Sequence, residues 1–166
     1  MQPRLTLVVA PLNAGKTTHL LKLIDEAERN GLVVSGVLAL ANPEKTWYRL
    51  KDLSTTESRL ALSEKQGLGK DRIGRFFIND EAFAWANALI EQSLETADVV
   101  VFDEIGKLET QEHGLAPSFH KALAQERATI LAAVRDVHVK VVMKHFGLEP
   151  SALTLMQVKK EDGTNE

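Results

Sequence analysis

The sequence predicts an α/β protein in which a mostly parallel sheet carries helices on both faces. Three observations lead to this prediction: short and continuously apolar runs, amphipathic runs between them, and glycine or proline near their junctions. Short apolar runs such as 5–10 and 129–134 suit strands that are buried on both faces. Because strand-like and helix-like runs alternate along the chain, the strands are expected to run parallel.

The first part of the chain is expected to form a strand, a helix and a second strand. Residues 5–10, LTLVVA, and 32–40, LVVSGVLAL, are the two strands. Residues 16–30 between them form an amphipathic helix that ends at Gly31. The face of this helix that meets the sheet is expected to carry Leu20, Leu21, Leu23, Ile24 and Ala27.

The middle of the chain has a different pattern. At about 36–62, alternating residues around the polar turn STTES predict a β-hairpin-like excursion. Residues 66–77 contain three glycines and are expected to be irregular. A helix is expected from Asn79 and Asp80 onward, which supply its cap. The buried side of this helix is expected to carry Phe83, Ala86, Leu89, Ile90 and Leu94.

The last part of the chain continues the alternation of strands and helices. Residues 98–104, DVVVFDE, are expected to form a buried strand that ends in two carboxylates, and 129–134 form the next strand. Residues 117–126 between them are expected to be helical because a proline in the first turn favours a helix start. The run 137–146 is rich in β-branched residues and fits either a short helix or a strand, and 153–158 is the last expected strand.

Composition limits the classes of protein to which the chain can belong. The length of 166 residues favours one domain, assigned to 1–158, and the polar end at 159–166 is expected to be a mobile tail. A net charge of −3 provides no strong basic field, which argues against nucleic acid as a partner. The chain has no cysteine, which excludes disulfides and thiolate metal sites. No apolar run approaches the roughly 18 residues of a membrane helix, so a cytoplasmic protein without membrane association is expected.

Residues 10–17, APLNAGKT, match a phosphate-binding loop: a small residue, four variable residues, then Gly-Lys-Thr. The match lies between a predicted strand and a predicted helix, where free backbone amides and the helix N-terminus can bind phosphate oxygens. That context disfavours the alternative, a plain turn with a surface lysine. Gly15 lets the backbone approach closely, Lys16 reaches the β- and γ-phosphates, and the Thr17 hydroxyl can ligate Mg²⁺. The predicted nucleotide-binding residues are Ala10, Pro11, Leu12, Asn13, Ala14, Gly15, Lys16, Thr17 and Thr18.

A second motif lies where Asp103 and Glu104 end the strand predicted at 98–104. In open parallel sheets, ligands bind at the carboxyl ends of the strands. Asp103 can hold Mg²⁺ there, directly or through water, and Glu104 can orient and deprotonate an attacking water. Acidic residues also end strands for structural reasons alone, so the loop is what favours a functional interpretation. The sequence therefore predicts Mg²⁺ as the cofactor, with Thr17 and Asp103 as its ligands.

With these two motifs, the chain resembles the small P-loop nucleoside-triphosphatases of the cancer-related nucleoside-triphosphatase type. The stretch DEIGKLE at 103–109 is similar to the hallmark of that family. The layout of 35–62, with its turn DLSTTE, and the stretch IGRFFINDEAFAWA at 73–86 are also similar to the family pattern. The resemblance covers about 5–135 and implies a P-loop fold with hydrolysis of ATP, GTP and other nucleoside triphosphates to diphosphates.

The sequence departs from the pattern of that family at three places. Ala10 replaces the usual first glycine of the loop, and Thr56 stands where the turn normally has glycine. Beyond Arg135 the family pattern is not matched. The resemblance implies a broad choice of base and leaves the cellular role open.

The expected reaction is phosphoryl transfer from a nucleoside triphosphate to water. Lys16 and Glu104 are the predicted catalytic residues: the lysine holds the phosphates with the loop amides, and the carboxylate aligns the water. Thr18 is expected to contact the α-phosphate. Because the transition state is stabilised mainly by charge, fast turnover also needs a cation over the γ-phosphate. The candidates for this cation are Lys107, Arg135, Arg59, Arg72 and Arg75.

Two other functions stay open at this point. A small-molecule or nucleoside kinase would use the same loop, with GKDRIGR at 69–75 as a short lid and Glu104 as the base for a hydroxyl acceptor. A nucleotide-binding switch or accessory protein with slow turnover would report its bound state to a protein partner. The second carboxylate argues against the switch, because a pure binding site does not need it.

The histidines give little indication of a further site. His113 and His120 are seven residues apart, as are His138 and His145, and this spacing can share a helix face. Two histidines without a supporting carboxylate or cysteine are weak evidence for a metal site. No aromatic residue is assigned to base binding.

Overall fold

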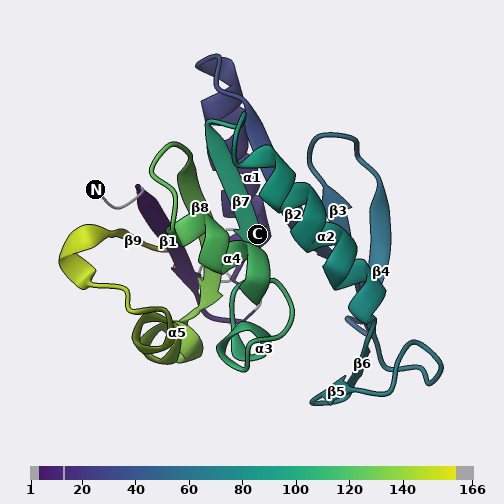
Figure 1. Cartoon of the computed structure of the whole chain (residues 1–166). Helices are drawn as coiled ribbons and strands as arrows, with labels where there is room; N and C mark the ends of the chain where they lie inside the picture. The colour runs from purple at the N-terminus through teal and green to yellow at the C-terminus, as the bar shows by residue number, and fades with distance from the viewer. Residues whose placement is uncertain (1–3, 13, 160–166) are drawn as a thin grey trace, which may run out of the picture.

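The computed structural model describes residues 4–12 and 14–159, so Asn13 and nearly all of the predicted tail at 159–166 lie outside the described residues. The described residues form one sheet with helices on both faces (Figure 1). The strands are β1 (Leu5–Ala10), β2 (Val34–Ala41), β3 (Trp47–Asp52), β4 (Ser58–Ser63), β5 (Arg72–Ile73), β6 (Phe76–Ile78), β7 (Val99–Asp103), β8 (Thr129–Arg135) and β9 (Thr154–Gln157). The α-helices are α1 (Lys16–Arg29), α2 (Asp80–Ser93), α3 (Lys107–Thr110), α4 (Ala116–Leu123) and α5 (Val139–Phe146), and short 3₁₀ turns occupy Asp136–His138 and Pro150–Ala152.

The strand order of the sheet is β5-β6-β4-β3-β2-β7-β8-β1-β9. Neighbours among β2, β7, β8, β1 and β9 pair in parallel. Neighbours among β2, β3, β4, β6 and β5 pair antiparallel. The parallel part confirms the predicted α/β class. The hairpin predicted at about 36–62 is also present as β3 and β4. It is not an excursion, however, because β3 pairs with β2 and the hairpin extends the main sheet.

Side chains of the parallel strands alternate between two apolar layers. Leu7 and Phe102 belong to the larger layer, which packs against α2, α4 and α5. Val8 and Val101 belong to the smaller layer, which packs against α1 on the opposite face. Figure 1 shows this arrangement, with α2 and α4 in front of the sheet and α1 behind it. Burial on both faces explains why these strands read as continuous apolar runs. In the part of the chain that the structure describes, no helix is long and apolar enough to cross a membrane.

Three local predictions are corrected or resolved by the structure. Leu20 and Ile24 of α1 are buried, but Leu21 is 47% exposed, because a residue one position after Leu20 turns about 100° away from the sheet. The stretch 66–77, expected to be irregular, contains β5 and most of β6, which form a small hairpin. The run 137–146 is helical: its first two residues end a 3₁₀ turn, and Val139–Phe146 form α5. The helix has a buried face with Val142 and an exposed face with Val141.

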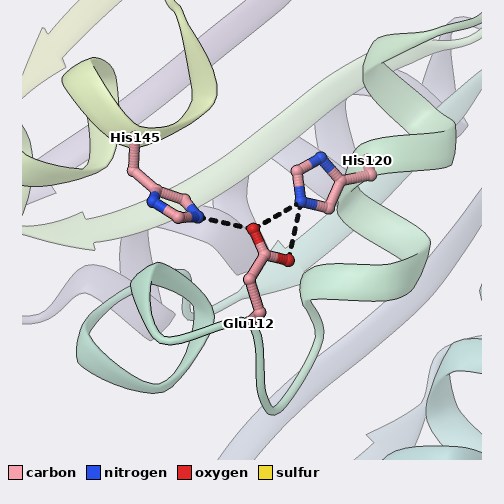
Figure 2. Close-up of side chains that lie close together, drawn as sticks. All are labelled: Glu112, His120 and His145. Atoms are coloured by element: carbon pink, nitrogen blue, oxygen red, sulfur yellow. Dashed lines mark hydrogen bonds and ion pairs between the residues drawn. The ribbon is translucent and has the colours of Figure 1, made fainter.

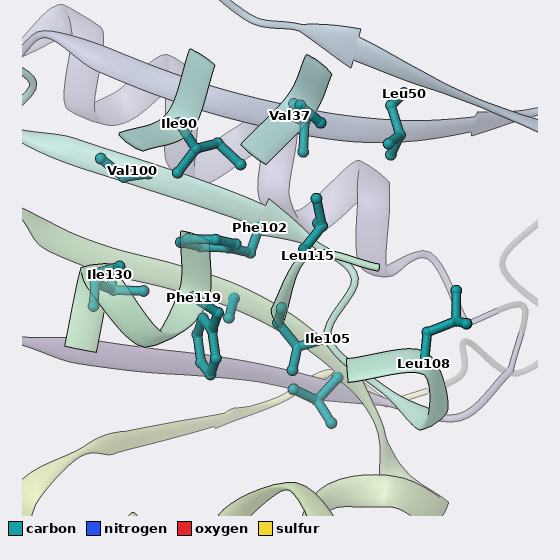
Figure 3. Packing of buried hydrophobic residues seen from close by; sticks show 14 of the residues in the cluster. Val37, Leu50, Ile90, Val100, Phe102, Ile105, Leu108, Leu115, Phe119 and Ile130 are labelled. Atoms are coloured by element: carbon teal, nitrogen blue, oxygen red, sulfur yellow. The ribbon is translucent and has the colours of Figure 1, made fainter. Parts of the chain in front are cut away.

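Three phenylalanines join the sheet to two helices. The rings of Phe102 on β7 and Phe119 on α4 meet edge to face with their centroids 5.1 Å apart, and both side chains are fully buried (Figure 3). Phe146 at the end of α5 meets Phe119 in the same way at 4.8 Å. Such aromatic pairs are favourable by roughly 0.5–1.5 kcal/mol beyond their buried area. Phe119 therefore fixes α4 and α5 to the sheet.

We expect Phe119→Ala to lower the free energy of unfolding by about 3–5 kcal/mol, because it removes a fully buried ring and leaves a cavity between α4, α5 and β7. Urea unfolding followed by circular dichroism measures this change. Val137→Ala is the control, since Val137 is 66% exposed and its change should stay within about 0.5 kcal/mol. Equal effects of the two substitutions would contradict the proposed role of Phe119.

Candidate active site

The phosphate-loop motif has the strand–loop–helix geometry that the sequence predicts. Ala10 is the buried last residue of β1, and the loop turns where the Ala14 amide donates to the Pro11 carbonyl oxygen at 3.2 Å. Gly15 caps α1 with φ of 82°, in the left-handed region that favours glycine. Lys16 is the first residue of α1, so the free amides at this helix end face the loop.

The carboxylate of Asp103 connects the loop to the acidic end of β7. Its Oδ2 atom accepts a hydrogen bond from the Thr17 hydroxyl at 3.1 Å and another from the Ala39 amide of β2 at 3.1 Å. Asp103 is only 3% exposed. Burial raises the pKa of Asp103 to about 6, the amide of Ala39 opposes this shift, and the neighbouring charge of Glu104 adds to it.

Lys16 and Glu104 form a second contact between the same two motifs. The Nζ atom of Lys16 lies 3.0 Å from Oε2 of Glu104, with the two side chains 10% and 37% exposed. The predicted magnesium ligands and the two predicted catalytic residues are therefore adjacent. They come from segments that are 86 residues apart in the sequence.

These side chains face a cavity of about 1120 Å³ at the carboxyl ends of the parallel strands. The predicted residues that line it are Leu12, Gly15, Lys16, Thr17, Thr18, Asp103 and Glu104. Ala10, Pro11 and Ala14 shape the loop without lining the cavity. The volume exceeds the roughly 300 Å³ of the smallest ligand pockets and is ample for a nucleotide.

The antiparallel part of the sheet supplies a wall that the sequence analysis did not assign. Tyr48 of β3 and Phe76 of β6 line the cavity, and their rings meet edge to face with centroids 5.5 Å apart. Burial and the charge of Glu104 raise the pKa of Tyr48, while Arg75 and Arg135 oppose the shift. The pairing of the antiparallel strands brings these residues to the site. No local pattern in the sequence predicts that pairing.

The hallmark stretch positions the acidic end of β7 through a buried carboxylate. Glu109 is 4% exposed and accepts hydrogen bonds from the Gly106 amide at 2.8 Å and the Leu115 amide at 2.9 Å. A side chain at Gly114 would collide with Glu109, since a Cβ there would lie 2.1 Å from Oε2. Burial raises the pKa of Glu109 to about 7, against the effect of the two amides. Glu109 closes the turn of α3, a helix too short to predict.

The structure divides the candidate cations into two groups. Arg59 lies over the ring of Trp85, and Arg72 lies over the ring of Phe77, so these two arginines are used elsewhere. Lys107, Arg75 and Arg135 line the cavity.

Arg135 is the least exposed of the three cavity-lining cations. It ends β8 directly beside Ala10, where the phosphate loop begins. Its Nε atom is buried and has no hydrogen-bond partner among the described residues. A buried donor without an acceptor is costly, and the side chain of Arg135 also lines the cavity.

The turn DLSTTE is held together by the side chain of Asp52. Asp52 accepts hydrogen bonds from the Ser54 amide and the Thr55 hydroxyl, both at 2.9 Å. Thr56 has φ of 66°, a left-handed conformation that glycine adopts more easily. This backbone conformation is compatible with the glycine that the resemblance predicted at this position.

A parallel sheet, a phosphate loop between β1 and α1, and an acidic motif at the end of β7 define a P-loop nucleotide-binding protein. The family model described as NTPase matches residues 6–162. The chain therefore belongs to the NTPase family, as its resemblance at the sequence level implied. The match also extends past Arg135, where the sequence analysis had ended the resemblance.

Similar proteins agree with this assignment. The nucleoside-triphosphatase THEP1 of Pyrococcus abyssi is 28% identical over 165 residues, which cover 92% of this chain and 90% of that protein. The nucleoside-triphosphatase THEP1 of Methanopyrus kandleri is 28% identical over 132 residues, covering 77% and 72% of the two chains. The crystal structure of THEP1 from Aquifex aeolicus matches the fold with a TM-score of 0.74 at 20% identity, covering 96% of this chain and 92% of that chain.

Glu109 should make the stability of the protein depend on pH. Because its pKa rises from an ordinary 4.5 to about 7 on folding, the folded state binds the proton more tightly than the unfolded state. The resulting stability is fully present below pH 4.5 and is lost as the pH rises through 7, by up to about 1.4 kcal/mol for each pH unit. Urea unfolding of the wild type and of Glu109→Gln between pH 4 and pH 8 measures this difference.

Glu95→Gln is the matched control, because Glu95 is exposed and its loss should leave the pH dependence of the wild type unchanged. A difference between wild type and Glu109→Gln that stays constant with pH would contradict the prediction.

Proposed function

We propose that this protein hydrolyses nucleoside triphosphates to nucleoside diphosphates and phosphate with the help of Mg²⁺. The observation that carries the proposal is the pair of contacts Thr17–Asp103 and Lys16–Glu104, which join the loop and the acidic motif in one cavity. A loop alone would bind nucleotide, but a carboxylate beside the loop lysine also provides a group that can act on water. The similar THEP1 proteins are named as nucleoside-triphosphatases, which supports the same reaction.

The oxygen atoms of Thr17 and Asp103 suit Mg²⁺, a hard cation that prefers oxygen ligands. They lie 3.1 Å apart, and the carboxylate is buried, so a cation there would compensate a charge that is costly to bury. The chemistry that Mg²⁺ supplies when bound is neutralisation of charge on the β- and γ-phosphates.

Lys16 connects phosphate binding to the activation of water. It pairs with Glu104, and a triphosphate in the loop would compete with this carboxylate for the ammonium group. Glu104 is then free to accept a hydrogen bond from a water molecule and to take its proton. The water oxygen forms a bond to the γ-phosphorus, the bond from that phosphorus to the β–γ bridging oxygen breaks, and the diphosphate leaves with the electron pair.

Arg135 is the side chain that we propose as the cation over the transferred phosphoryl group. Its position beside the first residue of the loop and in the lining of the cavity supports this role. Arg75 is less suited, because it pairs with Glu64 and donates to the Lys45 carbonyl oxygen at 3.1 Å. Lys107 lines the cavity but is exposed at the start of α3.

We expect Lys16→Ala to lose nucleotide binding and Glu104→Gln to retain it while turnover falls by about 10²- to 10⁴-fold, the usual contribution of a general base. Phosphate release from ATP, GTP, CTP and UTP, with Mg²⁺ or with EDTA, measures turnover, and fluorescent-nucleotide titration measures binding. Wild type should release phosphate only with Mg²⁺ and without an added acceptor.

Lys22→Ala and Glu26→Gln are matched controls, because both residues lie on exposed positions of α1. Phosphate release that needs a hydroxyl acceptor would favour the kinase instead. Tight binding without release in the wild type would favour a nucleotide-binding switch.

We expect Arg135→Ala to lower kcat by about 10³-fold or more, with a much smaller change in nucleotide affinity, since a charge-stabilising arginine acts mainly in the transition state. Arg135→Lys should recover part of the rate. Arg29→Ala, which removes an arginine that is 79% exposed on α1, is the control and should leave kcat unchanged. A normal kcat for Arg135→Ala would transfer this role to Lys107 or Arg75.

A further inference from the structure

Three side chains converge at a place that is separate from the phosphate-loop cavity: Glu112 from the turn after α3, His120 from α4 and His145 from α5 (Figure 2). We call them the Glu112 cluster. The Nε2 atom of His120 lies 2.9 Å from each carboxylate oxygen of Glu112, and Nε2 of His145 lies 2.6 Å from Oε1. One ligand atom from each residue lies within 4.8 Å of the others. None of the three residues lines the cavity described above.

The two imidazole rings are held in place by the core. The ring of Phe146 contacts both imidazole rings: its centroid lies 4.9 Å from that of His120 and 4.8 Å from that of His145. Phe146 in turn packs on the fully buried Phe119. The rings therefore present their Nε2 atoms to one point without a further loss of side-chain freedom, a condition that favours ligand binding.

The backbone also adopts an uncommon conformation to place the carboxylate. Glu112 has φ of 61°, and non-glycine residues in this left-handed region carry a conformational cost of order 1 kcal/mol. Glycine would adopt this conformation without the cost, but it has no carboxylate. Glu112 in this conformation reaches both histidines. Such outliers are typical of functional sites.

Two features of the cluster favour a cation, although Lys121 and Lys144 lie in the same last turns of α4 and α5. His120 and His145 both lie in the last turns of their helices, where the helix dipole stabilises positive charge. Glu112 adds a carboxylate, and its side chain is 52% exposed while those of His120 and His145 are 48% and 30% exposed. A cation can therefore enter from solvent and keep a water ligand.

We propose that Glu112, His120 and His145 form a binding site for one divalent transition metal ion such as Zn²⁺. Two imidazole nitrogens and one carboxylate are a ligand set that Zn²⁺ takes in proteins with water in the fourth position. Mg²⁺ and Ca²⁺ prefer oxygen ligands, so this site differs in metal preference from the Thr17–Asp103 pair. The metal would cross-link α4, α5 and the turn after α3.

The proposal is tested by metal binding to the untagged full chain after treatment with EDTA. Zn²⁺ is titrated by calorimetry in excess Mg²⁺, which occupies oxygen ligands elsewhere, and Co²⁺ is titrated by visible absorption. Because the chain has no cysteine, a Co²⁺ spectrum cannot come from thiolates. We expect one saturable Zn²⁺ site per chain and a higher melting temperature with Zn²⁺, since the metal binds the folded state.

Glu112→Gln, His120→Gln and His145→Gln should each weaken Zn²⁺ binding by at least about tenfold, the lower end of the loss caused by removing even an outer-shell partner of a metal site. His113→Gln is the matched control, because His113 is an exposed histidine adjacent to Glu112 and should leave the affinity unchanged. Melting temperatures in EDTA confirm that each variant is folded.

Saturable 1:1 binding that the three substitutions weaken and His113→Gln does not would support the site. Absence of such binding in the wild type would overturn the proposal and leave the cluster as a set of ion pairs between Glu112 and protonated histidines. Equal affinity of wild type and the three variants would overturn it as well, because Zn²⁺ would then bind elsewhere. The readout is binding and melting, so it is independent of whether nucleotides are hydrolysed.

Discussion

The buried carboxylate of Asp103 is the group on which the geometry of the candidate active site depends. It accepts hydrogen bonds from the first turn of α1 and from the backbone of β2, so one side chain joins three elements. An ionised group that loses its partners inside a protein costs several kcal/mol, which opposes separation of these elements. The strand order makes the contact possible, because only β8 separates β7 from β1 and both strands end at the same edge of the sheet.

The parts of this site that could be predicted from the sequence are the phosphate loop and the acidic motif, because each consists of contiguous residues. The run 5–10 is apolar because β1 is buried on both faces, and Gly15 follows because the backbone there is left-handed. Asp103 and Glu104 follow an apolar run because β7, like β1, is buried on both faces. The parallel alternation then placed the loop and the acidic motif at one edge, since carboxyl ends of parallel strands meet there.

The parts that could not be predicted depend on contacts between distant segments. Tyr48 and Phe76 line the cavity only because the antiparallel strands continue the sheet beyond β2. Glu109 looks like an ordinary helix residue, and only the structure shows that its carboxylate is buried and accepts hydrogen bonds from the amides of Gly106 and Leu115. The histidine spacing was misleading: His120 meets His145 of another helix, and the missing carboxylate comes from a turn.

The short segment from Gly106 to Glu112, which contains α3, lies between the candidate active site and the Glu112 cluster. Glu109 points inward and fixes the amide of Gly106, two residues after Glu104, while Glu112 points outward to α4 and α5. The same short segment is thus anchored from the inside by a buried carboxylate and from the outside by two histidines. Phe119 packs on Phe102 of β7, and Phe146 packs on Phe119. The two helices that carry the histidines of the Glu112 cluster are therefore fixed to the core. A ligand bound to the Glu112 cluster would therefore contact the short segment that follows Glu104, at a place outside the cavity.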